Sequence, residues 1–193
     1  MKPIIDIPDN MFLSMLLLIP LIFLWRMLAV HLAGKRGYKT TISHEAGVVL
    51  FLIFLAVLSS QTIWPNSTTA ETRMPNINLI PFKVLSIAYR DYVYNHSLDY
   101  FLISLTGNIA MFIPIGFFIP LLYRASLKKT LLSGFAVSLF IEIYQLPLLR
   151  WTDVDDLWLN TLGALLGYMA YAVIIRLFPV ISQKCKMVRK TPG

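Results

Sequence analysis

The sequence predicts an all-α membrane protein: a polytopic helix bundle with five transmembrane helices, the N-terminus outside the cell and the C-terminus inside. Three observations predict this class. The 193-residue chain is 57% hydrophobic and only 14% charged. Long stretches carry no Asp, Glu, Lys or Arg, and the basic residues fall in alternate connections between them. A soluble domain of this composition would expose too much apolar surface to stay dispersed.

Five apolar segments are long enough to cross a bilayer, which takes roughly 20 mainly apolar residues. Charge-free runs cover residues 10–25, 46–70, 100–123 and 157–175, and a fifth segment, 130–149, is interrupted only by Glu142. We therefore expect helices at about 10–33, 44–64, 99–123, 128–149 and 156–178. In the third of these, two prolines and two glycines predict a kinked or locally opened helix.

The net charge of +7 indicates membrane topology rather than nucleic-acid binding. Basic residues cluster after the first, third and fifth predicted helices, in 35–39, 124–129 and 176–190. The positive-inside rule places these three regions in the cytoplasm, so the partners that we expect are membrane lipids and not nucleic acid.

One membrane domain is expected over residues 1–181, followed by a basic cytoplasmic tail over 182–193. The connection 65–98 is expected to be the one long non-helical region, and a loop of this length inside a compact domain is usually functional. Cys185 is the only cysteine, which excludes an intramolecular disulfide.

Polar side chains recur at helical spacing in the last two predicted helices. Ser138 and Glu142 share one face, as do Asp156 and Asn160, because residues four apart lie on the same side of a helix. The second face continues into a G-x-x-x-G pair, Gly163 to Gly167, which lets another helix approach closely. The topology collects the polar residues on the outer side and predicts an extracytoplasmic pocket with these candidate binding residues: Asn78, Asn108, Glu142, Gln145, Asp153, Asp155, Asp156 and Asn160.

Other roles stay open for the acidic residues. The aspartates at 153–156 also fit N-terminal helix caps, and Glu142 also fits a protonated or hydrogen-bonded structural side chain. No cofactor is evident, although carboxylate oxygens would suit a divalent cation such as magnesium or calcium. The residues leave open whether the protein is an enzyme, in which Glu142 and the aspartates would be the acid and base groups.

Four blocks of this sequence together resemble the VanZ-like family of bacterial membrane proteins. The resemblance runs from about residue 76 to residue 171. It implies a multi-pass protein of the bacterial plasma membrane, and the namesake of the family is associated with resistance to teicoplanin. The matching blocks are Asn78-Leu-Ile-Pro81-Phe82, Gly107-Asn108-Ile-Ala-Met-Phe112-Ile-Pro114-Ile-Gly116, Glu142-Ile-Tyr-Gln145, and Arg150-Trp-Thr-Asp153-Val-Asp155-Asp156 with its continuation through Asn160-Thr161-Leu-Gly163.

The resemblance and the polar residues together predict a cell-envelope protein that lowers susceptibility to glycopeptide and lipoglycopeptide antibiotics such as teicoplanin. The expected ligand is a lipid-linked envelope precursor or the lipoglycopeptide itself, with the loop 78–82 as a cover. One alternative is an enzyme or binding protein that acts on a lipid or lipid-carrier headgroup. Another is a structural membrane scaffold, whose polar face only packs helices.

Overall fold

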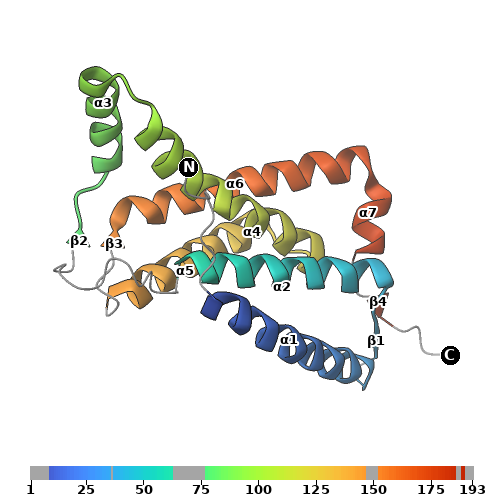
Figure 1. Cartoon of the computed structure of the whole chain (residues 1–193). Helices are drawn as coiled ribbons and strands as arrows, with labels where there is room; N and C mark the ends of the chain where they lie inside the picture. Colours follow the sequence, from blue (N-terminus) through green and yellow to red (C-terminus); the bar gives the residue numbers. More distant parts are fainter. Residues whose placement is uncertain (1–8, 36, 63–76, 147–151, 186–187, 190–193) are drawn as a thin grey trace. The chain divides into compact units, whose positions relative to one another are not determined.

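The computed structural model describes residues 9–35, 37–62, 77–146, 152–185 and 188–189 (Figure 1). Almost all of them are helical, which confirms the prediction of an all-α chain. The elements in chain order are α1 (Asp9–Lys35), β1 (Tyr38–Lys39), α2 (Ile42–Thr62), β2 (Ile77–Asn78), α3 (Lys83–Asn95), the π-helix η1 (Phe101–Thr106), α4 (Gly107–Tyr123), α5 (Leu127–Gln145), β3 (Thr152–Asp153), α6 (Val154–Leu177), α7 (Pro179–Lys184) and β4 (Val188–Arg189).

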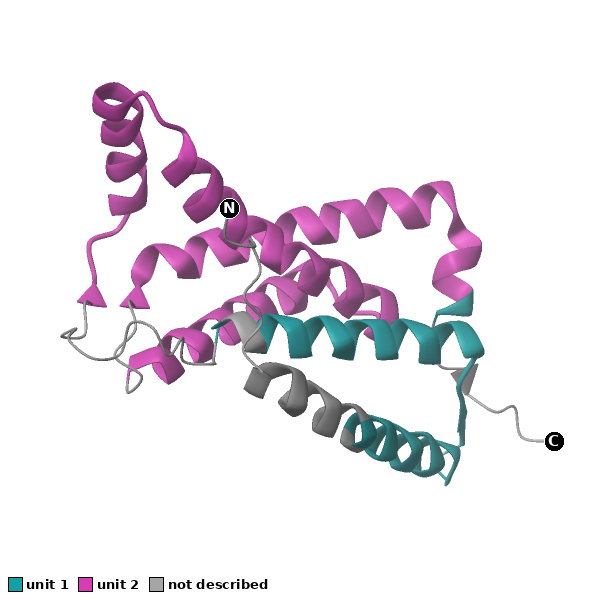
Figure 2. Cartoon of the chain, viewed as in Figure 1, with its two compact units in different colours: residues 1–64, 184–193 teal, residues 65–183 magenta. Residues whose placement is uncertain are grey.

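The chain forms two compact units (Figure 2), of which unit 1 comprises residues 1–64 and 184–193 and unit 2 comprises residues 65–183. In unit 1, β1 pairs antiparallel with β4. The Arg26 side chain on α1 donates two hydrogen bonds to the Glu45 carboxylate on α2, at 2.6 and 2.8 Å. This bidentate ion pair lies in a groove of about 460 Å³ whose other walls are mainly apolar.

Three helices in the described part of the chain are long and apolar enough to cross a membrane. They are Ile42–Ser59 within α2, Phe101–Tyr123 across η1 and α4, and Val154–Leu177, which is α6. The 19 residues of α5 carry Lys128, Lys129 and Glu142, so no 18-residue stretch of this helix has fewer than three charged residues. The count of five spans and the N-out/C-in topology stay predictions.

One element of unit 2 contradicts the sequence analysis. The connection 65–98 was expected to be non-helical, but residues 83–95 form α3. This short helix packs Val84 and Ala88 against Leu105 and Leu159, so its stability comes from residues far away in the sequence. Tertiary packing of this kind overrides weak local propensity.

The third predicted helix is irregular at its beginning and not at the prolines, where the kink or opening was expected. Residues 101–106 form the π-helix η1, a conformation that often marks functional sites. The α-helix α4 then runs through both Pro114 and Pro120. The irregular backbone therefore lies before the prolines rather than at them.

Helices α4 and α6 approach each other closely because glycines line their contact. A Cβ atom added to Gly163 would lie 2.2 Å from the carbonyl oxygen of Ile109, and one added to Gly167 would lie 2.0 Å from that of Ile113. Gly116 on α4 faces the Ala164 carbonyl in the same way, at 2.0 Å. The prediction that the G-x-x-x-G pair lets another helix approach closely is confirmed. The partner helix is α4.

Candidate functional site

The end of unit 2 at which α5 ends and α6 begins gathers most of the predicted polar residues. We call it the acidic end. Polar side chains of the three helices α4, α5 and α6 meet there. A fourth segment, β2, joins them through its short parallel pairing with β3. The α5–α6 hairpin and the antiparallel run of α4 produce this convergence, as the alternating topology predicts. Basic residues lie at the opposite ends of these helices: Arg124, Lys128, Lys129 and Arg176.

Glu142 on α5 and Asp156 on α6 form a carboxyl pair at the acidic end. Their side chains are hydrogen-bonded to each other. A hydrogen bond between two carboxyl groups needs one proton between them, because an ionised carboxylate can only accept. Asp156 also accepts a hydrogen bond from the side-chain amide of Asn108 on α4. The Glu142 carboxyl accepts a further one from the backbone N–H of Asp153, at 3.1 Å. The pair thus ties α4, α5 and α6 together.

One helical turn further from the acidic end, Ser138 and Asn160 form a second polar contact between α5 and α6. The Asn160 amide nitrogen donates to the Ser138 hydroxyl at 2.9 Å, and that hydroxyl donates to the backbone carbonyl of Asp156 at 3.4 Å. Both side chains are buried. The two helices therefore match polar residues at two successive levels, Glu142 with Asp156 and Ser138 with Asn160.

Asp153 is the N-cap of α6, as the capping alternative predicts. Its carboxylate accepts the backbone N–H of Asp155 at 2.9 Å, which satisfies one of the free donors of the first turn. The same oxygen accepts the side-chain amide of Asn78 at 2.8 Å. The side-chain carbonyl oxygen of Asn78 in turn accepts a hydrogen bond from the backbone N–H of Ile80, at 3.2 Å. Asp153 therefore connects the loop 78–82 to the start of α6.

Asp155 has a different task, which is to cap α3. Its fully buried carboxylate accepts the backbone N–H groups of Phe82 and Val84 at 2.5 and 2.8 Å, and the indole N–H of Trp158 at 2.9 Å. Phe82 has a left-handed backbone with φ 62°, and its ring lies 5.6 Å from that of Trp158. A non-glycine residue in this conformation needs support from its surroundings. Asp155 provides it from 73 residues away in the sequence.

Several predicted residues of the acidic end are buried, and the pocket open to the outside stays a prediction. Glu142 is 6% exposed and Asn160 is 5% exposed, and Gln145, at the end of α5, is also buried. Glu142 and Asn160 belong to a connected set of hydrogen-bonded residues. We call the connected set the polar network: Asn78, Asn108, Ser138, Glu142, Asp153, Asp156 and Asn160.

The described residues also bear on the predicted divalent cation. Among residues 9–35, 37–62, 77–146, 152–185 and 188–189, no three His, Cys, Asp or Glu side chains are placed to hold a metal ion. The divalent cation stays a prediction.

Sequence reasoning missed several residues of the site. Ser138 was placed on the correct face but left out of the candidate set, although its spacing of four from Glu142 was the available signal. Tyr100, just before η1, is hydrogen-bonded to Ser104. Burial raises the pKa of the Tyr100 hydroxyl above its usual value, and the negative charges of the three neighbouring aspartates add to this. Tyr100 therefore borders the acidic end, and nothing in the local sequence signals this.

Comparisons with known proteins agree with the resemblance noted in the sequence. The family model described as VanZ/LLP1 matches residues 46–176, which is more than half of the chain. The match contains the four blocks and extends beyond them into α2. Neither the curated proteins nor the solved structures that were searched give a match.

Proposed function

Since the chain belongs to the VanZ/LLP1 family of membrane proteins, we propose that it is a multi-pass protein of the bacterial plasma membrane that lowers susceptibility to teicoplanin-type glycopeptides. The polar network would bind the polar part of an amphiphile, either a lipid-linked envelope precursor or the lipoglycopeptide itself. One observation carries this proposal: a connected set of buried and half-buried polar side chains sits at one end of apolar helices. Polar groups in such surroundings are costly and usually functional.

On this proposal, the loop 78–82 moves together with α3 and exposes the polar network to its ligand. Several contacts hold this segment in place, among them the Asn78 side chain with Asp153 and the N–H groups of Phe82 and Val84 with Asp155. Both ends of α3 have left-handed non-glycine residues, Phe82 at φ 62° and His96 at φ 49°. On this proposal these two positions are the hinges, because residues at the ends of an element can absorb a change of backbone direction. A ligand would replace the internal hydrogen bonds that the movement breaks.

We expect Glu142→Gln and Asp156→Asn to reduce teicoplanin resistance to that of cells without the protein. Each substitution keeps the size of the side chain and replaces one carboxyl group of the pair by an amide, which cannot exchange a proton with the remaining carboxyl group. The measurement is the minimal inhibitory concentration in a susceptible strain that expresses each variant to the same level in its membranes. Asp91→Asn, on α3, is the matched control and should keep full resistance, because Asp91 bonds only Asn95 through its side chain. Full resistance in both network variants would disprove the proposal.

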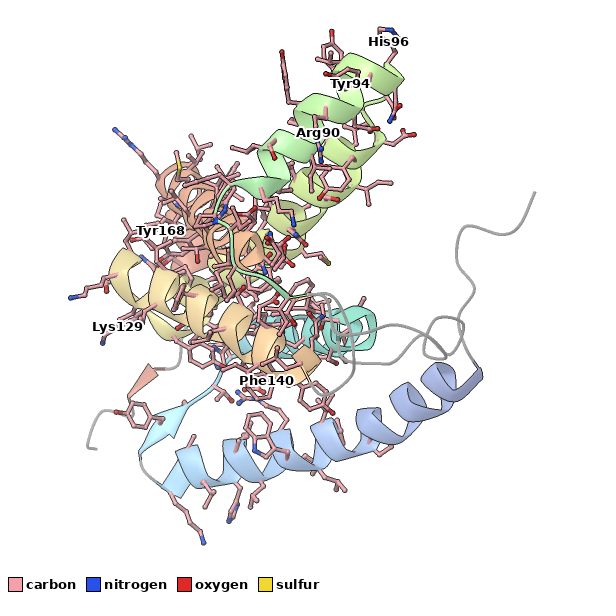
Figure 3. All side chains as sticks on the ribbon, turned by 90° about the vertical axis from the view of Figure 1, so that its left-hand side faces the viewer. Arg90, Tyr94, His96, Lys129, Phe140 and Tyr168 are labelled. Carbon is pink, nitrogen blue, oxygen red and sulfur yellow. The ribbon has the colours of Figure 1, made fainter. Side chains whose placement is uncertain are left out.

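The topology is tested by cysteine labelling in a Cys185→Ser background. Tyr94 on α3 is 77% exposed, and Lys128 at the start of α5 is exposed at the opposite end of unit 2 (Figure 3 labels Tyr94 and the neighbouring Lys129). We expect an impermeant maleimide to label Tyr94→Cys on intact cells and Lys128→Cys only after the membrane is opened. Labelling of Lys128→Cys on intact cells would reverse the orientation and place the polar network on the cytoplasmic side.

The carboxyl pair also favours a second candidate function. Two carboxyl groups that share a proton offer an acid and a base at one place, which suits hydrolysis or group transfer on a lipid headgroup. Lipid extracts of expressing cells separate the two functions. An enzyme would change the headgroup composition in a way that Glu142→Gln abolishes, whereas a binding protein would leave the composition unchanged. A scaffold would change neither the headgroup composition nor the resistance, and every network variant would only lose stability.

A further inference from the structure

The polar network contains more hydrogen-bond acceptors than donors. Its carboxyl groups face amide donors from Asn78 and Asn108 and two backbone N–H groups, those of Asp153 and Asp155. Within the described residues, neither Glu142 nor Asp156 is paired with a Lys or Arg side chain. With one shared proton, the pair retains one negative charge. A ligand that complements it must bring donors and positive charge.

Asn160 adds an acceptor whose orientation is fixed by its neighbour. The Ser138 hydroxyl has one proton, which it donates to the Asp156 carbonyl, so it can only accept from Asn160. The amide nitrogen of Asn160 must therefore point at Ser138, and its carbonyl oxygen points elsewhere. That oxygen is buried and has no hydrogen-bond partner among the described residues. A buried amide oxygen without a partner costs free energy, which a bound donor would recover.

The three acceptors lie on neighbouring turns of the same helix pair. Asn160 follows Asp156 by one turn on the inner face of α6, and Glu142 stands opposite Asp156 on α5. A primary ammonium has three N–H donors and one positive charge. It matches two carboxyl groups that carry one net negative charge, together with one amide oxygen. A phosphate would be repelled, and a trimethylammonium would supply the charge without donors.

We propose that the group bound by the polar network is a primary ammonium carried by an amphiphile, held by Glu142, Asp156 and Asn160. This inference rests on the proposed function as a binding protein and specifies its ligand. The apolar part of the amphiphile would lie along the lipid-facing side of α5, where Phe140 and Ile143 are 60% and 57% exposed.

The test compares phospholipids of which only one carries a primary ammonium in its headgroup. The purified full chain in detergent is offered equal amounts of phosphatidylethanolamine, phosphatidylcholine and phosphatidylglycerol with identical acyl chains, and the retained lipids are counted by native mass spectrometry. We expect phosphatidylethanolamine to be retained about tenfold over phosphatidylcholine, the factor that corresponds to one charge-assisted hydrogen bond. Free ethanolamine distinguishes the source of the group: displacement of the lipid means that a free amine suffices, and no displacement means that the acyl chains are required.

Two variants make the test specific. Asn160→Leu removes one acceptor without changing the charge and should lower the preference about tenfold. Glu142→Gln is nearly isosteric, should abolish the preference, and serves as the second variant if Asn160→Leu does not fold. Asp91→Asn should behave as the unchanged protein. Equal retention of the ethanolamine and choline lipids, or a preference that both variants keep, overturns the inference. If site variants lose resistance but the protein shows no such preference, the binding function stands and only its ligand class is wrong.

Discussion

Gly163→Ala is expected to lower the free energy of unfolding by about 3 kcal/mol, the upper part of the range for overpacking a well-packed contact. The added methyl group would lie 2.2 Å from the Ile109 carbonyl oxygen and 2.9 Å from the Phe112 Cβ. The carbonyl belongs to the α4 backbone, which cannot rotate away as a side chain does. The two helices must therefore separate, and the hydrogen bond between Asn108 and Asp156 lengthens with them.

The measurement is reversible unfolding of the purified chain in mixed micelles, followed by circular dichroism. Gly107→Ala is the matched control, since a Cβ there meets nothing within 4 Å and the backbone is already right-handed helical, at φ −60°. We expect this control to be neutral or slightly stabilising, because alanine has the higher helix propensity. If the two variants unfold alike, the close contact between α4 and α6 is not the source of stability.

The periodic parts of the structure were predictable from the sequence. Long uncharged runs fix the main helices, because only an apolar segment of that length suits a membrane. Spacings of four placed Ser138 with Glu142 and Asp156 with Asn160, and the alternating chain direction brought these two faces to one end. The glycine pair in α6 indicated a close helix contact, although the sequence did not say that α4 is its partner.

The individual roles of the aspartates could not be predicted in the same way. Asp153, Asp155 and Asp156 lie within four residues, and each has the same chemistry in the sequence. Their tasks differ because successive residues at a helix start point in different directions, toward Asn78, toward α3 and toward Glu142. The helix α3 was missed for a related reason: its cap is supplied by Asp155 rather than by a neighbouring residue. A contact between residues so far apart in the chain cannot be predicted from the sequence around α3 alone.

Asp155→Asn is expected to destabilise the chain by about 3 kcal/mol, because it replaces a fully buried acceptor that binds three N–H donors. An asparagine keeps one carbonyl oxygen, which can still serve the Phe82 N–H and the Trp158 indole. Its NH₂ group then faces the Val84 N–H, and two buried donors oppose each other. Asp91→Asn is again the control, since its side-chain bond to Asn95 is exposed and an amide oxygen can still accept it. Its effect should stay within about 0.5 kcal/mol.

Hydrogen exchange distinguishes loss of this cap from general destabilisation. Because the Phe82 and Val84 amides lose their acceptor directly, peptides covering the start of α3 should exchange faster in Asp155→Asn even under conditions where α4 and α6 stay protected. Uniform acceleration over unit 2 would mean that Asp155 only supports the core. Selective acceleration would show that α3 can detach while the bundle stays folded. That is the movement which we propose exposes Glu142, Asp156 and Asn160 to a ligand.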